Sequence, residues 1–153
     1  MNAEEAKATL ESDLGQKIRE LVTPAPRRMF VTVEGADLVE ACRVIHDRLK
    51  ITHLSTITGL DTGERFEVLY HFATHNLALT LRALVSRDNP ILHTAVDVFP
   101  SAVLYEREVH DILGVYYEGH PDLRPLVLPD GWPEGVYPLR KDWTYDRQQG
   151  VIA

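Results

Sequence analysis

The stretch Asn76-Leu77-Ala78-Leu79-Thr80-Leu81-Arg82-Ala83-Leu84-Val85-Ser86-Arg87 is the one on which the predicted fold depends most. Its apolar residues fit two periods. Five consecutive odd positions from Leu77 to Val85 are apolar, as in a strand with one buried face, whereas Leu77, Leu81, Leu84 and Val85 would also line one side of a helix. Because the alternation holds without a break, we predict a strand.

Strand patterns also precede this stretch. Residues 29–34 alternate, with Met29, Val31 and Val33 on one face. Residues 51–60 and 66–73 read as a strand pair, and the residues Asp61-Thr62-Gly63-Glu64 between them are typical of a hairpin turn. These strands together predict a small sheet.

Three helices are expected around that sheet. The first is indicated by the helical spacing of Leu10, Leu14, Ile18 and Leu21 and ends before Thr23-Pro24-Ala25-Pro26. The second runs from about Asp37 to Leu49. The third runs from about Asp97 to Leu113 and ends at Gly114, and its apolar face is made by Val98, Ala102, Tyr105, Val109 and Ile112. The fold class is therefore α/β (α+β), with a small mixed sheet flanked by helices.

Composition excludes several classes of function. The 153 residues are 44% hydrophobic and 25% charged, as in one soluble globular domain, and the net charge of -7 argues against a nucleic-acid binder. No apolar run reaches the roughly 18 to 20 residues that cross a bilayer, and the acidic start of the chain is not a secretory signal, so we expect a cytoplasmic protein. The single Cys42 predicts a buried thiol and cannot supply the thiolates of an iron–sulfur cluster.

The charged side of the third helix allows four interpretations. We predict Arg107 and Asp111 as a pair on its outer face, with Glu106 and His110 paired beside them. This face is a solvated surface, an acid–base site, a metal site or a docking surface. The metal site would use Glu106, His110, His120 and Asp122, whose oxygen and imidazole ligands suit zinc, manganese or iron.

The end of the chain differs in character from the rest. Residues 118–153 hold five of the nine prolines and four of the nine glycines, and also both tryptophans. A disordered linker would be poor in large apolar and aromatic side chains, and Trp, Tyr and Arg are favoured anchors of protein interfaces. We therefore divide the chain into an α/β domain, 1–117, and an extended proline-rich tail, 118–153. The tail either folds back on its own sheet or braces a partner subunit, and we predict the second.

Three blocks of sequence carry a resemblance to a known family. They are Glu106-Arg107-Glu108-x-x-Asp111-x-x-Gly114, Gly119-His120-Pro121-Asp122-Leu123-Arg124 and Pro138-Leu139-Arg140-Lys141-Asp142. In this order they resemble the signature of the respiratory-chain NADH dehydrogenase 30 kDa subunit of complex I. The resemblance covers about residues 99–143.

The resemblance implies an accessory subunit without a cofactor, in the peripheral arm of a membrane-bound oxidoreductase and on the cytoplasmic side of the membrane. The chain would dock on the large catalytic subunit (49 kDa or hydrogenase large-subunit type), next to iron–sulfur subunits and a membrane arm. The iron–sulfur clusters and the flavin or NiFe centre would lie in those partners, and the isolated chain would not be catalytic. The implied contacts with partner subunits, including an aromatic anchor in the tail, are at Glu106, Arg107, Glu108, Asp111, His120, Asp122, Arg124, Trp132, Arg140, Lys141 and Asp142.

Two positions depart from the complex I pattern. His110 stands where an aromatic residue is usual, and Pro125 stands in place of a second arginine. Residues 128–137 look more like the version in energy-converting membrane-bound hydrogenases and formate hydrogenlyase-type complexes. The electron donor is thus open between these branches. The alternative of a different class is a free-standing metal-dependent enzyme that uses Glu106, His110, His120 and Asp122.

Overall fold

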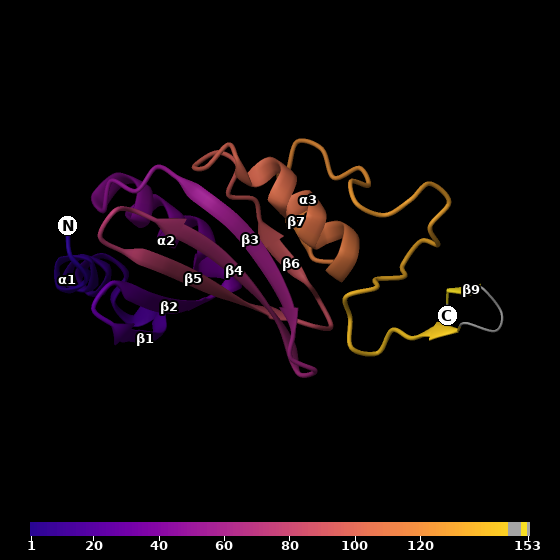
Figure 1. Ribbon diagram of the computed structural model, residues 1–153, viewed down its shortest axis with the longest axis horizontal. Coiled ribbons are helices and arrows are strands. Elements are labelled where there is room, and N and C mark those ends of the chain that lie inside the picture. The colour runs from indigo at the N-terminus through magenta and orange to yellow at the C-terminus, as the bar shows by residue number, and fades with distance from the viewer. Residues whose placement is uncertain (147–150, 153) are drawn as a thin grey trace.

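A computed structural model describes residues 1–146 and 151–152 and has a five-stranded sheet at its centre (Figure 1). The strands lie in the order β1 (Ile18–Ala25), β2 (Arg28–Glu34), β5 (Ala78–Ser86), β4 (Arg65–Ala73) and β3 (Leu54–Asp61). β2 and β5 are parallel and the other neighbours are antiparallel. The prediction of a mixed sheet is confirmed.

The strand predicted from residue 76 onward is confirmed as β5, in the middle of the sheet. Its odd-numbered side chains, from Leu79 to Val85, are at most 3% exposed and face the core together with Met29, Val31 and Val33 of β2. The opposite face of the sheet is polar, since His71 bonds to Thr58 and Thr80 across three strands. The helices pack on the apolar face, where the core lies.

The predicted hairpin between residues 61 and 64 is also confirmed. It joins β3 to β4 through a bond of 3.0 Å from the Thr62 N–H to the Arg65 carbonyl. The Asp61 carboxylate accepts from the Gly63 N–H at 2.8 Å, and Gly63 takes the left-handed conformation at φ +91° that favours glycine.

The first helix is shorter than predicted. α1 spans Ala3–Leu14 and ends at Gly15, whose φ is +52°. Ile18 and Leu21, which the helical spacing assigns to this helix, lie in β1 and pair with Val33 and Val31 of β2. The helical spacing was wrong here because pairing with β2 decides the conformation. Pro24 did not end a helix; it lies in an edge strand, where a missing N–H is tolerated.

The second helical segment is confirmed over residues 35–48. A 3₁₀ turn, Gly35–Asp37, leads into α2, Leu38–Arg43, and a π turn, Val44–Arg48, follows. Leu38, Ala41, Cys42 and Ile45 are fully buried, so the prediction of a buried thiol is confirmed.

The third helix, α3, spans Ala102–Leu113 and so begins five residues later than predicted. Pro100 explains the difference, because the residue before a proline is disfavoured in the helical region. Gly114 ends the helix at φ +84°, as predicted. Two short strands, β6 (Ile91–His93) and β7 (Tyr116–Glu118), flank α3 as a parallel pair that we did not predict.

The tail leaves the domain after β7 and runs past the end of α3 (Figure 1, orange to yellow). It has little regular structure, as predicted, apart from β8 (Tyr145–Asp146), which pairs with β9 (Val151–Ile152). Among the described residues, no helix is both long and apolar enough to cross a membrane.

Candidate docking site on the third helix and the tail

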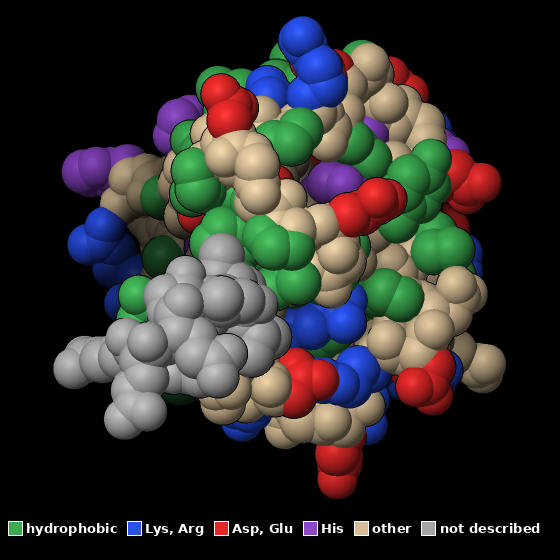
Figure 2. Space-filling view, turned by 90° about the vertical axis from the view of Figure 1, so that its right-hand side faces the viewer, with side chains coloured by type: hydrophobic (Ala, Val, Ile, Leu, Met, Phe, Trp, Pro, Cys, Tyr) green, Lys and Arg blue, Asp and Glu red, His purple; other side chains and the backbone are tan. Residues whose placement is uncertain are grey.

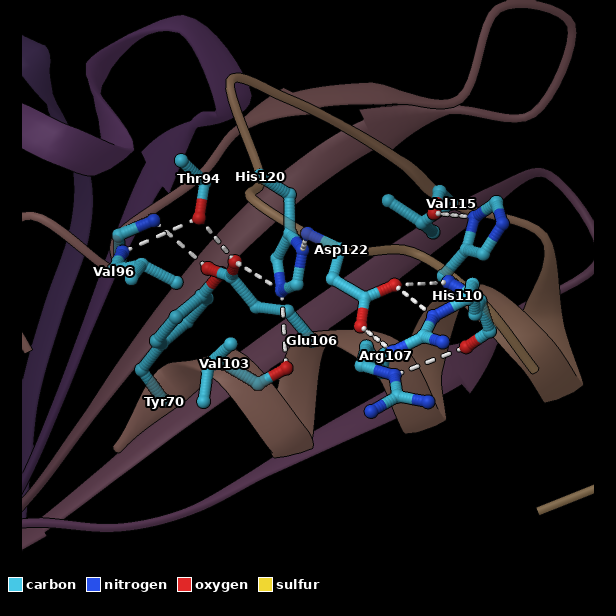
Figure 3. Close-up of polar contacts among 12 residues, drawn as sticks. Tyr70, Thr94, Val96, Val103, Glu106, Arg107, His110, Val115, His120 and Asp122 are labelled. Carbon is cyan, nitrogen blue, oxygen red and sulfur yellow. Dashed lines mark hydrogen bonds and ion pairs between the residues drawn. The ribbon is translucent and has the colours of Figure 1, made fainter. Parts of the chain in front are cut away.

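Glu106 points into the molecule (Figure 3). Its carboxyl group is fully buried and accepts hydrogen bonds from the Ala95 N–H at 2.8 Å, from the Tyr70 hydroxyl at 3.2 Å and from the Thr94 hydroxyl. The predicted position on the outer face, beside His110, is therefore wrong. The sequence spacing does indicate a buried position for Glu106. It follows Ala102 by four residues and precedes Val109 by three, which places it on the same helix face as these two buried residues.

Burial raises the pKa of Glu106 to about 7, against the opposing effect of hydrogen bonds from Thr94, Ala95 and Tyr70. A second titratable group lies beside it, since the His120 Nε2 is 3.9 Å from Glu106 Oε2 and both side chains are 0% exposed. Burial lowers the pKa of His120. His120 Nδ1 accepts from the Asp122 N–H at 3.0 Å, so the ring proton is on Nε2 and is donated to the Val103 carbonyl, also at 3.0 Å.

Of the four residues of the metal hypothesis, Glu106 and His120 lie side by side, but the four do not form a ligand set. His110 Nδ1 donates to the Val115 carbonyl at 2.9 Å, and both carboxylate oxygens of Asp122 bond to Arg124. Across residues 1–146 and 151–152, no three His, Cys, Asp or Glu side chains form a group that could hold a metal ion. The metal hypothesis therefore lacks a ligand set in this part of the chain.

Arg107 and Asp111 hold the tail rather than each other. Arg107 donates to the carbonyls of Arg124 and Pro125, each at 3.0 Å. Asp111 Oδ2 accepts from the next three backbone N–H groups, of Leu126, Val127 and Leu128, at 3.1, 2.8 and 2.9 Å. The predicted pair between the two side chains is wrong, because Arg107 donates to backbone carbonyls of the tail and Asp111 accepts from backbone N–H groups of the tail. We call Arg107, Asp111 and the backbone of residues 124–128 the tail clamp.

A second anchor holds the tail at residues 139–142. The Leu139 N–H donates to the Ile112 carbonyl at 2.9 Å, and Arg140 Nε donates to the Leu113 carbonyl at 2.8 Å. The Arg140 guanidinium also lies over two aromatic rings, 4.4 Å from the centre of Tyr137 and 5.0 Å from that of Phe66. These contacts cover the last carbonyls of α3, which have no partner within the helix.

Asp61 completes this anchor, although we predicted it only as a turn residue. Its carboxylate accepts from the Lys141 N–H at 2.8 Å and pairs with Arg87, which also bonds to Asp142 at 3.2 Å. Burial alone would raise the pKa of Asp61, but the bonds from Arg87 and the two backbone N–H groups outweigh it and lower the pKa to about 2. No pattern near Asp61 indicates a partner 80 residues away.

The tail is thus attached to its own domain at two places, first along α3 and then at the end of α3 together with the β3–β4 hairpin, where it contacts Asp61 and Phe66. Of the other residues predicted at the interface, Glu108, Lys141 and Asp142 are exposed, and Arg124 is exposed while bonded to Asp122. Trp132 is half-buried and donates from Nε1 to the Val136 carbonyl at 2.8 Å. Contact of these side chains with another subunit stays a prediction.

Large apolar side chains remain exposed at this end of the molecule. Figure 2 looks at this end and shows apolar side chains (green) gathered between charged ones. Val127 and Tyr145 are more than half exposed, and so are Leu104 of α3 and Tyr116 of β7. Leu126 and Leu139 are exposed by 42% and 44%. We call these six side chains the apolar end surface.

Comparisons with known proteins agree on one family. The family described as "Respiratory-chain NADH dehydrogenase, 30 Kd subunit" matches residues 31–149. A similar curated protein is the C-type subunit of the F(420)H(2) dehydrogenase of Methanosarcina mazei, 35% identical over 146 residues, which are 91% of this chain and 92% of the relative. The C-type subunit of the NADH-quinone oxidoreductase of Chloroherpeton thalassium is 36% identical over 77% of this chain, and the match spans only 51% of that relative.

A solved structure gives the same result for the fold. It is that of the membrane-bound sulfane sulfur reductase, an archaeal respiratory membrane complex, and one of its chains matches with a TM-score of 0.80 and 27% identity. The match covers 95% of this chain and 86% of the other. The shared fold therefore includes most of the tail as well as the α/β domain.

Proposed function

This chain belongs to the family of the respiratory-chain NADH dehydrogenase 30 kDa subunit, and we propose that it is an accessory subunit that docks on the large catalytic subunit of a complex I-like membrane-bound oxidoreductase. It would support electron transfer coupled to ion translocation by holding that subunit in place. Relatives named after F(420)H(2) dehydrogenase and NADH-quinone oxidoreductase are subunits of such enzymes. Their names support the complex as the setting of this chain.

The observation that carries the docking role is the way in which the tail clamp presents apolar side chains to the outside. Arg107 and Asp111 fix the backbone of residues 124–128, yet Leu126 and Val127 in this segment stay 42% and 55% exposed. Exposed apolar side chains gathered between charged ones, as Figure 2 shows at this end of the molecule, are typical of a protein interface.

The redox centres would belong to the partners. The only cysteine, Cys42, is fully buried in the core, and burial raises the pKa of its thiol, so this side chain does not suit a cluster. We propose that iron–sulfur clusters, and a flavin or NiFe centre, lie in neighbouring subunits on the cytoplasmic side of the membrane. The hydrogenase-type branch suggested by residues 128–137 stays a prediction.

The test is an affinity purification of the tagged chain from gently solubilised native membranes, with mass spectrometry of its partners. We expect a hydrogenase-type or 49 kDa-type large subunit and iron–sulfur subunits to co-purify. Assays of NADH–quinone and hydrogen-evolving activity on the same sample would identify the branch. Recovery of the chain alone, with a stoichiometric metal ion, would contradict the proposal.

A further inference from the structure

A groove of about 310 Å³ lies between the end of α3 and the tail segment 125–137. The side chains of Trp132 and Tyr137 and three prolines of the tail line it. The bond from Trp132 Nε1 to the Val136 carbonyl, 2.8 Å long, closes the loop that forms one wall. The groove is therefore an aromatic site built by the tail and attached to α3 through Asp111.

Three carboxylates also line the groove. Asp111 is 8% exposed, and its Oδ2 already accepts three backbone N–H groups, while its Oδ1 has no hydrogen bond among the described residues. Asp130 and Glu134 are exposed and form no ion pair in residues 1–146 and 151–152. Asp111 Oδ1 is not among the buried polar atoms without a partner, so it is open to solvent and can accept from a donor outside the chain.

No lysine or arginine of the described residues lines this groove. His110 is the one basic side chain among the described residues that line it, with Nδ1 engaged by the Val115 carbonyl. The nearby arginines are bound elsewhere, since Arg107 donates to the tail backbone and Arg140 to the Leu113 carbonyl. The negative charge of the groove is therefore available to a group from outside the chain.

Aromatic walls together with carboxylate acceptors select one chemical class of occupant. A guanidinium group is planar, stacks on aromatic rings and donates several N–H bonds to carboxylates. The protein already binds a guanidinium in this way next to the groove, because Arg140 lies 4.4 Å from the centre of the Tyr137 ring. An ammonium group lacks the planar surface, and an anion would be repelled.

We propose that this groove receives an arginine side chain of the subunit on which the chain docks. This inference rests on the proposed function and deepens it, since it gives the chemistry of one contact with the partner. The tail clamp places the groove beside the apolar end surface. The arginine would therefore bind at the edge of the contact between the apolar end surface and the partner subunit, and would belong to that interface.

The first test uses the isolated chain and a small probe. N-acetyl-arginine N-methylamide would be titrated while the indole N–H signal of Trp132 is followed by NMR, with the citrulline analogue as the uncharged control of the same shape. We expect saturable binding of the arginine probe and about tenfold weaker binding of the citrulline probe. Equal affinity for both probes, or no saturable binding, would overturn the proposal.

Substitutions give the matched comparison. Asp130→Asn combined with Glu134→Gln should weaken binding of the arginine probe about fivefold, because it removes two carboxylates of the groove. The control, Glu64→Gln combined with Asp88→Asn, removes the same charge from exposed positions that do not line the groove and should leave the affinity unchanged. An equal loss in both double variants would mean that net charge alone attracts the probe, and the groove would be ruled out.

The second test uses the complex and separates this inference from the proposed function. Complexes purified through the wild-type chain and through the two double variants would be washed with increasing salt. We expect the groove variant to lose its partner at lower salt than the control variant. If all three chains keep the partner equally, the groove proposal fails and the docking function stands; if even the wild-type chain brings down no partner, the docking function itself fails.

Discussion

At the scale of single residues, Glu106 has the most unusual environment. It is a fully buried carboxyl group between β4 and α3, and its neighbours are the Tyr70 hydroxyl, the Thr94 hydroxyl and His120. Burial also raises the pKa of Tyr70 and of Tyr117 nearby. Because burial disfavours the charged form of its carboxyl group, ionisation of Glu106 works against the fold.

We predict that Glu106 contributes a fall in the free energy of unfolding as the pH rises from about 4.5 to about 7, whereas His71 and His120, whose pKa values burial lowers, contribute in the opposite direction. The folded pKa of Glu106, about 7, exceeds the ordinary value of 4.5, so in this range Glu106 binds more protons in the folded protein than in the unfolded chain. The full effect is on the order of 3 kcal/mol. Glu106→Gln should remove the falling contribution, so that in urea unfolding curves the stability of the variant falls less with pH than that of the wild type across this range.

Glu108→Gln is the matched control, because Glu108 is exposed on the same helix. It should leave the slope as in the wild type. A slope that persists in Glu106→Gln would show that another group carries the effect.

Gly114 offers a prediction with a close control. A Cβ at Gly114 would lie 2.6 Å from Arg140 Nη2 and 2.6 Å from the Tyr137 ring, at φ +84°, whereas Gly131 has φ +83° and no atom within 4 Å of its Cβ position. Both alanine substitutions bear the conformational cost of about 1–2 kcal/mol. Only Gly114→Ala should also displace the second anchor, so it should destabilise the protein more in chemical denaturation. Equal destabilisation would show that the Arg140 and Tyr137 contacts do not matter to the fold.

At the scale of elements, the strands and turns that could be predicted from the sequence are those with a regular alternation of apolar residues or with typical turn residues. The strand β5 and the β3–β4 hairpin are correct because apolar alternation and turn residues are local signals. Ile18 and Leu21 were misassigned because their helical spacing competes with pairing to β2, which is not visible locally. The partners of Asp61 and Asp111 could not be predicted either, since each accepts from backbone N–H groups that any residue could supply.

The tail clamp leads to a prediction about α3 and residues 124–128. Asp111→Ala leaves three backbone N–H groups without an acceptor, and we expect a loss of roughly 1–3 kcal/mol. The amides of Leu126, Val127 and Leu128 should exchange hydrogen faster than in the wild type, and proteases should cut this segment more readily. Limited proteolysis and hydrogen exchange measure both effects.

The control on the same helix is Glu108→Ala, which removes an exposed carboxylate that holds no part of the tail within the described residues. It should leave the exchange of residues 126–128 unchanged. Unchanged exchange in Asp111→Ala as well would mean that the apolar contacts of the tail, and not the clamp, hold it to α3.

At the scale of the whole molecule, the three separated blocks near the end of the chain predicted the family, and the comparisons confirm it. Residues of the same blocks form the tail clamp and the second anchor. These contacts bring the blocks together in space although other residues separate them in the sequence. The electron donor cannot be read from them, because it depends on residues of other subunits. The elements that carry the apolar end surface, α3, β7 and the tail, lie opposite the edge formed by α1 and β1 (Figure 1).

Hydrogen exchange of the chain, measured alone and within the purified membrane complex, tests the docking of this end most directly. If this end docks on the partner, we expect added protection in residues 104–145, above all at Leu126, Val127 and Leu139, and unchanged exchange in β1. Added protection confined to β1 and α1, with residues 124–139 exchanging as in the free chain, would contradict it.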